Sequence, residues 1–377
     1  MTSRVACALA CGGMGLVGCG EAGTSQSSFS CGGGTADVLW AASDYIASSV
    51  GGLSLPGGVV SEASGVDLGA DPALAISRGR AFFVVRDQSA IVELDPTCGT
   101  PLSRVDVPPP AGAIGALDPQ DVGVARDGSL WVPLFDVPAL VVVSSSGELA
   151  QTIDLSSYDS DGNPNASAVA MVDTASGEKA FVVLERLSAE LQPYQPAWVL
   201  RIDVEAAAIE AYVPLAGSNP FGLVYAEGGV LWLADPGSWF DATETDAGIE
   251  RFDPQTSTTA VVVSESELGA SVAEVAVSGT CAVAIVADAT TVNATSLVTV
   301  DLTSGTITIP VANSPLSTAG YDLDGLEFVG STLLVGDRRR AVTGYPVHTF
   351  EVDDSCNLSK GGDLVLAQPP VALRQAR

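Results

Sequence analysis

The feature that most constrains this fold is a short apolar run, ending in a carboxylate, that recurs seven times along 377 residues. The runs are Val38–Asp44, Ala81–Asp87, Leu130–Asp136, Ala180–Glu185, Leu231–Asp235, Cys281–Asp288 and Thr332–Asp337. Their end carboxylates are spaced 43 to 53 residues apart, a period typical of propeller blades and related repeats. Trp40, Trp131 and Trp232 recur at equivalent places and are predicted to pack between repeats.

A second element follows each run in register, as two strands joined by a polar turn. In the second unit Ile91–Asp95 turns into Leu102–Val107, and in the fourth Leu200–Asp203 turns into Ile209–Val213. A third element opens most units, where Asp-Pro or Asn-Pro leads into an apolar strand. Proline has no backbone N–H group, and at the first position of a strand this removes no hydrogen bond of the sheet. Each unit therefore supplies four strands, and we predict an all-β, seven-bladed β-propeller.

The first unit lacks an innermost strand, because the residues before Val38 have the composition of a tether. Near the end of the chain, Pro369–Arg374 parallels the strand entry Asp71–Ile76 of the second unit. We therefore predict that the C-terminal segment inserts beside Val38–Ser43 and closes the ring. The alternative is a propeller of six full blades.

The N-terminus has the layout of an export signal, in which Arg4 precedes the short, modestly apolar stretch Val5–Gly18. The sequence Leu-Val-Gly-Cys that ends at Cys19 resembles the lipobox of bacterial lipoproteins. That resemblance implies that Cys19 becomes the lipidated first residue of the mature chain. Gly20, by the same resemblance, favours the outer membrane or cell surface. The alternative is a coincidental cysteine.

These features divide the chain into three segments. Residues 1–18 are the expected lipoprotein signal peptide, 19–35 a flexible tether from the lipidated cysteine, and 36–377 the β-propeller. The small, polar tether spans roughly 20 to 25 Å by random-coil scaling. No later apolar run reaches about 18 residues, so we expect membrane contact through the lipid anchor only.

Cysteine usage fits an exported protein, because removal of the signal and lipidation leave an even set of four: Cys31, Cys98, Cys281 and Cys356. Three pairings are possible. Cys281 and Cys356 fall in turns on the same face of adjacent units, which predicts their bridge and leaves Cys31 with Cys98. Free buried thiols are the alternative. A Cys/His zinc site lacks ligands, since His348 is the only histidine.

The formal net charge of −29 restricts the partners. Such a field repels phosphate backbones, so nucleic acid is not expected, and cations or cationic partners are favoured. The one basic cluster, Arg338–Arg340, is interpreted as a solvated loop or an anion contact. We expect a monomer that binds a cell-envelope protein, a glycan or a small molecule.

Two Asp-x-Asp-Gly motifs are candidate cation sites, because alternate carboxylates at a glycine turn suit a hard cation such as Ca²⁺. The candidate ligands are Asp159, Asp161, Asn163, Asp322 and Asp324. Neither motif is an EF-hand, and tight turns without metal are the alternative. Calcium is therefore a possible cofactor, and no cofactor is certain.

About residues 36–370 resemble bacterial propellers of the NHL or YVTN-repeat kind, especially lipoprotein propellers, at Asp161–Pro164 and Asn219–Gly222. Those degenerate motifs support fold better than activity. A triad hydrolase needs a histidine base, and His348 falls inside a strand, so we expect no enzyme and assign no catalytic residue. The expected function is a binding or scaffolding module at the bacterial cell envelope.

Two other functions stay open. The calcium-dependent gluconolactonase family shares this general architecture, which would imply a metal-dependent, lactonase-like hydrolase with its site at the channel mouth. Its candidate ligands are Asp118, Asp159, Asn163, Asn219 and Asp322. The third function is structural packing in an envelope complex that holds no ligand.

Overall fold

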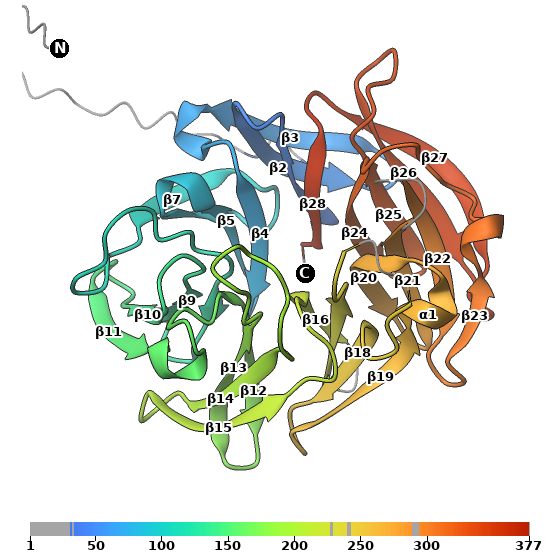
Figure 1. The fold of residues 1–377 in the computed structure, drawn as a ribbon. Coiled ribbons are helices and arrows are strands. Elements are labelled where there is room, and N and C mark those ends of the chain that lie inside the picture. Colours follow the sequence, from blue (N-terminus) through green and yellow to red (C-terminus); the bar gives the residue numbers. More distant parts are fainter. Residues whose placement is uncertain (1–30, 32–33, 227–228, 240–242, 289–293, 377) are drawn as a thin grey trace, which may run out of the picture. The chain divides into compact units, whose positions relative to one another are not determined.

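The computed structural model describes residues 31, 34–226, 229–239, 243–288 and 294–376. Their strands form seven four-stranded antiparallel sheets arranged around a ring, which is a seven-bladed β-propeller (Figure 1). The prediction from the repeat is confirmed, and the six-blade alternative is wrong. The expected signal peptide and most of the tether lie outside the described residues. Within the described part, no helix has the length and apolar character that crossing a bilayer requires.

Strands of each blade are lettered A to D from the channel outward. Blade 1 contains β28 (Pro370–Gln375), β1 (Val38–Ser43), β2 (Ser48–Ser54) and β3 (Gly58–Gly65). Blade 2 contains β4 (Pro72–Ser77), β5 (Arg80–Val85), β6 (Ala90–Leu94) and β7 (Pro101–Asp106). Blade 3 contains β8 (Gly123–Val124), β9 (Leu130–Pro133), β10 (Ala139–Val143) and β11 (Leu149–Asp154). Blade 4 contains β12 (Ala166–Thr174), β13 (Gly177–Leu184), β14 (Trp198–Asp203) and β15 (Ala208–Pro214).

The other three blades repeat this order. Blade 5 contains β16 (Phe221–Ala226), β17 (Val230–Asp235), β18 (Gly248–Asp253) and β19 (Thr258–Ser264). Blade 6 contains β20 (Ser271–Ser278), β21 (Cys281–Ala287), β22 (Thr295–Asp301) and β23 (Thr306–Ile309). Blade 7 contains β24 (Leu323–Val329), β25 (Thr332–Asp337), β26 (Tyr345–Val352) and β27 (Leu358–Leu366). The helical segments are short: α1 (Glu265–Leu268), η1 (Val66–Leu68), η2 (Arg86–Gln88), η3 (Ser156–Tyr158) and η4 (Val311–Asn313).

The C-terminal segment closes the ring, as predicted. β28 is the innermost strand of blade 1 and pairs antiparallel with β1, so that Trp40 lies opposite Leu373 and Leu39 opposite Arg374. A further backbone hydrogen bond, from the N–H of Ala376 to the carbonyl of Asp37, extends the pairing at 2.9 Å. In Figure 1 the red strand β28 lies beside the blue strands of blade 1, although the two segments are at opposite ends of the chain.

The hydrophobic core is divided into clusters between neighbouring blades. The cluster that joins blades 7 and 1 includes Trp40, Leu334 and Leu373, each 0% exposed. Trp131 and Trp232 pack toward the following blade, between blades 3 and 4 and between blades 5 and 6, whereas Trp40 packs toward the preceding blade, so the three positions are not equivalent. The predicted packing role of the three tryptophans is confirmed. Every blade is covered by both neighbours, so an open ring would expose the apolar faces of its two end blades.

Carboxylates near the channel also tie blades together. Glu274 on β20 accepts hydrogen bonds from the N–H groups of Gly325 and Leu326 at the bulged start of β24, at 3.0 and 3.1 Å. Asp121, just before β8, accepts one from the N–H of Val169 on β12 at 2.9 Å. A bulge leaves N–H groups outside the strand ladder, and the neighbouring blade supplies the acceptors that β24 needs.

The two ends of the strands define two faces of the propeller. Because successive strands are antiparallel, the B–C loops and D–A connections lie on one face, here called the mouth face. The A–B and C–D turns lie on the opposite face, here called the base face. The candidate site described below belongs to the mouth face, and both disulfides belong to the base face.

The disulfides join the two cysteine pairs expected from the sequence. Cys31 bonds to Cys98 in the C–D turn of blade 2, with Cα atoms 5.8 Å apart. Cys281, at the start of β21, bonds to Cys356 in the C–D turn of blade 7, with Cα atoms 5.5 Å apart. They close loops of 67 and 75 residues, each worth about 4 kcal/mol in a chain-entropy treatment.

Candidate functional site

The mouth face carries a cavity of about 500 Å³. Loops from separate parts of the ring line it: the B–C loop of blade 4, the B–C loop of blade 5, and the connection from blade 6 to blade 7. The lining residues are Leu191, Gln192, Pro193, Ser238, Trp239 and Tyr321. A cavity of this size is in the range of small-molecule sites.

Aromatic rings form one wall of this cavity. The rings of Trp239 and Tyr321 meet edge to face, with centroids 6.0 Å apart, and Phe221 packs on the other side of Trp239 at 5.6 Å. Tyr321 is 44% exposed, Phe221 41% and, opposite them, Leu191 55%. Exposed rings and an exposed leucine at one cavity form a surface that an apolar part of a ligand can cover.

Asn219 connects the aromatic wall to a buried carboxyl below it. With its amide oriented to satisfy both neighbours, its oxygen accepts from Trp239 Nε1 at 3.3 Å and its nitrogen donates to Glu185 Oε2 at 3.2 Å. Glu185 ends β13 and is 2% exposed. Burial raises the pKa of Glu185 to about 8, and the Asp118 carboxylate adds to that effect. Glu185 is therefore largely protonated at neutral pH.

A second polar group lies at the start of blades 2 and 3. The Arg86 guanidinium pairs with Asp71 and donates to the Gln120 side chain at 3.1 Å. Burial raises the pKa of the Asp118 carboxyl to about 6 against the attraction of Arg86. Asp118 and Glu185 thus titrate in different ranges, although both are influenced by Arg86.

The basic cluster that the sequence left as a solvated loop or anion contact is largely engaged with carboxylates. Arg338 pairs with Asp324 at 2.9 Å and lies over the Tyr45 ring, 4.7 Å from its centroid. Arg339 pairs with Asp337 at 2.7 Å. The solvated-loop interpretation is therefore wrong for Arg338, whose side chain is 14% exposed beside Asp324, whereas Arg339 stays exposed next to the carboxylate of Asp337 at the end of β25.

One expected cation loop, residues 159–163, keeps unpartnered oxygens. One oxygen of Asp159 accepts from Tyr194 and, at 2.8 Å, from Gln195, whereas its Oδ2 is buried without a hydrogen-bond partner. Asn163 Oδ1 is likewise buried and unpartnered, while its amide donates to a backbone carbonyl at 3.0 Å. Asp161 is exposed and accepts from the backbone N–H of Asn163. The calcium prediction stays a prediction at this loop.

The other motif, Asp322-Leu-Asp324-Gly325, is not a loop before strand A. β24 already begins at Leu323, and Gly325 occupies the bulge with a φ of +83°. The Asp324 carboxylate is paired with the Arg338 guanidinium. Burial nevertheless raises the pKa of Asp324 to about 6. A metal cation at this motif would have to compete with the Arg338 guanidinium for Asp324, which disfavours calcium binding at Asp322 and Asp324.

The residues proposed as metal ligands of a hydrolase do not form one cluster of acidic side chains. Across the described ranges, the only group of three or more His, Cys, Asp or Glu with ligand atoms mutually within 4.8 Å is Cys31, Asp95 and Cys98. Two of these form a disulfide, so this group is not a metal site. Asp118, Asp159 and Asp322 therefore do not form such a group, and Asn219 is engaged with Glu185 and Trp239.

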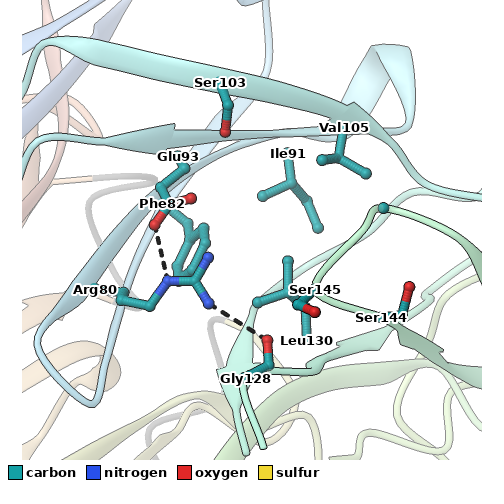
Figure 2. Close-up of a pocket in the computed structure, with 11 residues that line it drawn as sticks. Arg80, Phe82, Ile91, Glu93, Ser103, Val105, Gly128, Leu130, Ser144 and Ser145 are labelled. Atoms are coloured by element: carbon teal, nitrogen blue, oxygen red, sulfur yellow. Dashed lines mark hydrogen bonds and ion pairs between the residues drawn. The ribbon is translucent and has the colours of Figure 1, made fainter.

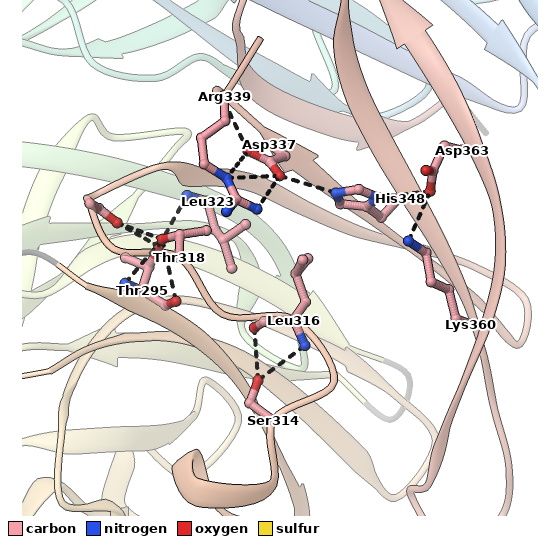
Figure 3. A network of polar contacts seen from close by, with 11 residues as sticks. Thr295, Ser314, Leu316, Thr318, Leu323, Asp337, Arg339, His348, Lys360 and Asp363 are labelled. Carbon is pink, nitrogen blue, oxygen red and sulfur yellow. Dashed lines mark hydrogen bonds and ion pairs between the residues drawn. The ribbon is translucent and has the colours of Figure 1, made fainter. Parts of the chain in front are cut away.

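The single histidine has a structural environment (Figure 3). His348 on β26 contacts Asp337 through Nε2 at 3.1 Å and Asp363 through Nδ1 at 2.7 Å. Burial alone would lower the pKa of His348, but the two carboxylates outweigh it and raise the pKa. Burial alone would raise the pKa of Asp337, but the hydrogen bonds from His348 and Arg339 hold it well below its usual range. Through these two contacts His348 bridges strands B, C and D of blade 7.

A second cavity is too small for an organic ligand (Figure 2). It measures about 70 Å³ and lies between blades 2 and 3. Arg80 crosses it, pairing with Glu93 at 2.8 Å and lying over the Phe82 ring at 5.0 Å. Such a volume holds about two waters, so the mouth-face cavity is the better candidate.

Sequence reasoning missed the residues that line the main cavity. Leu191, Trp239 and Tyr321 lie in connecting loops, where the strand repeat gives no position-specific signal. One signal in the sequence could have indicated this cavity: several large apolar residues occur in loops that are predicted to lie on the mouth face. Exposed Tyr45 and Tyr194 on the same face belong to that pattern.

Comparisons with known proteins support the fold. No family model and no curated protein matches the chain. A solved protein from Lactobacillus plantarum is 15% identical, over 89% of this chain and 98% of that one, with a TM-score of 0.55. Dihydro-heme d1 dehydrogenase NirN in complex with DHE is 13% identical over 93% and 69%, with a TM-score of 0.53. An inactive virginiamycin B lyase from Staphylococcus aureus with quinupristin is 10% identical over 80% and 88%, at 0.51. At these identities the likeness concerns the fold alone.

Proposed function

We propose that this chain is an exported, lipid-anchored propeller of the bacterial outer membrane or cell surface that binds a small organic cation at its mouth face. The observation that carries the proposal is the cavity of about 500 Å³ walled by Trp239 and Tyr321. Two disulfides agree with an extracytoplasmic location. Two solved propellers of similar fold are described with a bound compound, quinupristin in one and DHE in the other.

Charge at the cavity favours a cation over an anion. Burial raises the pKa of Tyr321, and the carboxylates of Asp324 and Glu274 raise it further, against the opposing effect of Arg338. Two carboxyl groups, those of Asp324 and Glu274, thus act on the Tyr321 hydroxyl against one guanidinium, that of Arg338. The same face already holds one cation against an aromatic ring, since Arg338 lies over Tyr45. An organic cation over Trp239 and Tyr321 would use the same attraction.

Calorimetric titration with benzyltrimethylammonium tests this site. We expect measurable binding to the wild type and a loss of about 2- to 30-fold in affinity for Tyr321→Ala, which corresponds to a cation–π contribution of about 0.5 to 2 kcal/mol. Tyr321→Phe keeps the ring and should bind nearly as well as the wild type.

The matched control is Tyr212→Ala, because Tyr212 is also exposed but stacks on Trp198 at 4.2 Å, outside the cavity lining. That variant should bind like the wild type. Equal affinities for Tyr321→Ala and the wild type, or binding of neutral benzyl alcohol as tight as that of the cation, would reject the proposed ligand class. A neutral glycan that binds in its place would keep the site and change the ligand.

The lipid anchor has its own test. Cys19→Ser removes the acceptor of the lipid, and the described residues contain no spanning helix, so the variant should leave the membrane fraction. Fractionation with a carbonate wash measures the change, with wild type as the membrane-bound control. A Cys19→Ser protein that stays with the membranes would show that another element holds it.

We also propose weak Ca²⁺ binding at the loop of residues 159–163. Asp159 Oδ2 and Asn163 Oδ1 are buried acceptors without partners, and such oxygens are suitable ligands for a hard cation. Calorimetry should show Ca²⁺ binding that Asp161→Asn abolishes and Asp322→Asn leaves unchanged. Absence of heat, together with an unchanged melting temperature in Ca²⁺ and in chelator, would end the calcium proposal.

A further inference from the structure

We infer that the mouth face is a docking surface for a basic protein segment that also carries apolar side chains. This surface extends beyond the cavity proposed to take a small cation, because it includes the B–C loops of blades 1 and 7, which do not line that cavity. It follows from where the exposed apolar side chains lie, from how they connect to the cavity, and from the charge of the loops around them.

The exposed apolar side chains of the described residues are distributed unevenly over the propeller. Apart from those on the outer D strands, the large ones lie in B–C loops, in D–A connections or at the mouth-face end of a strand A, and none lies in an A–B or C–D turn. Ile46 is 84% exposed in blade 1, Val342 103% in blade 7, and Ile114 95% between blades 2 and 3. Apolar contact with a partner is therefore available at the mouth end of the ring.

Aromatic rings connect the cavity to the loop of blade 1. Phe221 packs on Trp239, and Trp239 packs on Tyr321. The Arg338 guanidinium lies over the Tyr45 ring, 4.7 Å from its centroid, and donates to the Tyr45 hydroxyl at 3.1 Å. Burial raises the pKa of Tyr321, Tyr45 raises it further and Arg338 opposes the rise, so both groups lie near Tyr321. Blade 5, the connection between blades 6 and 7, and blade 1 thus contribute to one surface.

The loops around this surface are acidic. The B–C loops of blades 1 to 5 each carry an exposed carboxyl, at Asp44, Asp87, Asp136, Glu190 and Asp246. Across the described B–C loops and D–A connections, the exposed basic side chains are Arg339 and Arg340, and the Arg339 guanidinium already pairs with Asp337 at 2.7 Å. A partner that carries Lys and Arg is therefore complementary to this face, and an anionic partner is repelled.

A protein segment fits these observations better than a small molecule alone. A ligand that fills the cavity contacts its lining and leaves Tyr45, Ile46 and Val342 in water. A basic segment can cover these side chains with apolar ones and face the carboxyls with Lys or Arg, which is the arrangement of an apolar centre and a charged rim found in protein interfaces. The cavity would then receive one cationic side chain, and this part of the inference rests on the cation site proposed above.

An array of random linear peptides tests the docking surface. The fluorescently labelled Cys19→Ser protein is applied to the array, and the strongest binders are measured in solution by fluorescence polarisation. We expect these binders to be enriched in Lys or Arg together with Leu, Phe or Trp, because charge and apolar area both contribute. Absence of binders, or enrichment in Lys and Arg without apolar residues, overturns the inference.

Paired variants identify the face that binds. Ile46→Ser combined with Val342→Ser removes apolar side chains of the mouth face outside the cavity lining, and should weaken peptide binding about fivefold or more. Val59→Ser combined with Leu102→Ser is the matched control, because it removes exposed apolar side chains from the outer D strands of blades 1 and 2. The control should bind the peptides like the parent protein, and both variants should bind benzyltrimethylammonium unchanged.

The two ligands separate this inference from the proposed function. Equal peptide affinities for the mouth-face variant and the D-strand control, in a protein that binds benzyltrimethylammonium, overturn the docking surface alone. Peptide binding that depends on Ile46 and Val342, in a protein that does not bind benzyltrimethylammonium, supports the docking surface and rejects the small-cation function.

Discussion

A protein truncated after Gln368 is expected to lose its folded ring, or to melt many degrees below the full chain. The deletion removes β28, whose backbone pairs with β1 and whose Leu373 is 0% exposed in the core between blades 7 and 1. β1 would then become an open inner edge with unpaired N–H and C=O groups. Loss of an unstructured tail would leave stability almost unchanged, so the size of the effect distinguishes the two cases.

Circular dichroism melting of graded variants measures this closure. Leu373→Ala keeps the strand and removes only its buried side chain, with an expected cost of about 2 to 5 kcal/mol. Val342→Ala alters a residue that is fully exposed on the mouth face and should melt like the wild type. A truncated protein that melts with the wild type would show that the ring is closed without β28.

Stability should be greatest near pH 5 and should fall as the pH rises toward 8. Burial raises the pKa of Glu185 to about 8, of Glu274 to about 7 and of Asp324 to about 6. In this window the folded state holds protons that the unfolded chain has released, so the free energy of unfolding decreases as pH rises. At about 1.4 kcal/mol per pKa unit, Glu185 alone contributes on the order of 4 kcal/mol.

Two other groups set the shape of the profile. The raised pKa of His348 stabilises the fold below its ordinary value and loses that contribution as pH rises, in the same direction as the buried carboxyls. The lowered pKa of Asp337 acts oppositely, because its contribution is lost as the pH falls through the acid range. The two effects together predict a maximum in mild acid.

Glu185→Gln isolates the contribution of Glu185. The amide keeps the size of the side chain and cannot ionise, so the variant should lose less stability than the wild type between pH 5 and pH 8. Melting temperatures across this range measure the slope, and Glu148→Gln, at an exposed carboxyl in a C–D turn, is the control. Equal slopes for Glu185→Gln and the wild type would show that Glu185 does not titrate in this window.

The fold could be predicted from the sequence because its signals are local and repeated. Each apolar run ending in a carboxylate became a strand B, from Val38–Ser43 to Thr332–Asp337. Ring closure followed from the similarity between Pro369–Arg374 and the entry of blade 2. The Cys281–Cys356 bridge followed from two turns on one face of adjacent blades. In each case a short residue pattern was enough to assign a segment to one strand or turn of a blade.

The candidate site could not be predicted because its residues share no repeat position. Leu191 and Tyr321 are 130 residues apart in the sequence and line one cavity only because the ring brings their loops together. The pairing of Asp324 with Arg338 could not be predicted either, because the two residues come from different strands. The Asp-x-Asp-Gly motif suggested that Asp324 binds a metal cation. In the structure, the guanidinium of Arg338, at the end of the neighbouring strand β25, pairs with Asp324 instead.

The most direct test of the central claim is a crystal structure of the Cys19→Ser protein soaked with benzyltrimethylammonium. The account predicts that the cation lies in the mouth-face cavity, with its ammonium group against the rings of Trp239 and Tyr321. An empty cavity at saturating concentration, or a cation bound only elsewhere on the propeller, would contradict it.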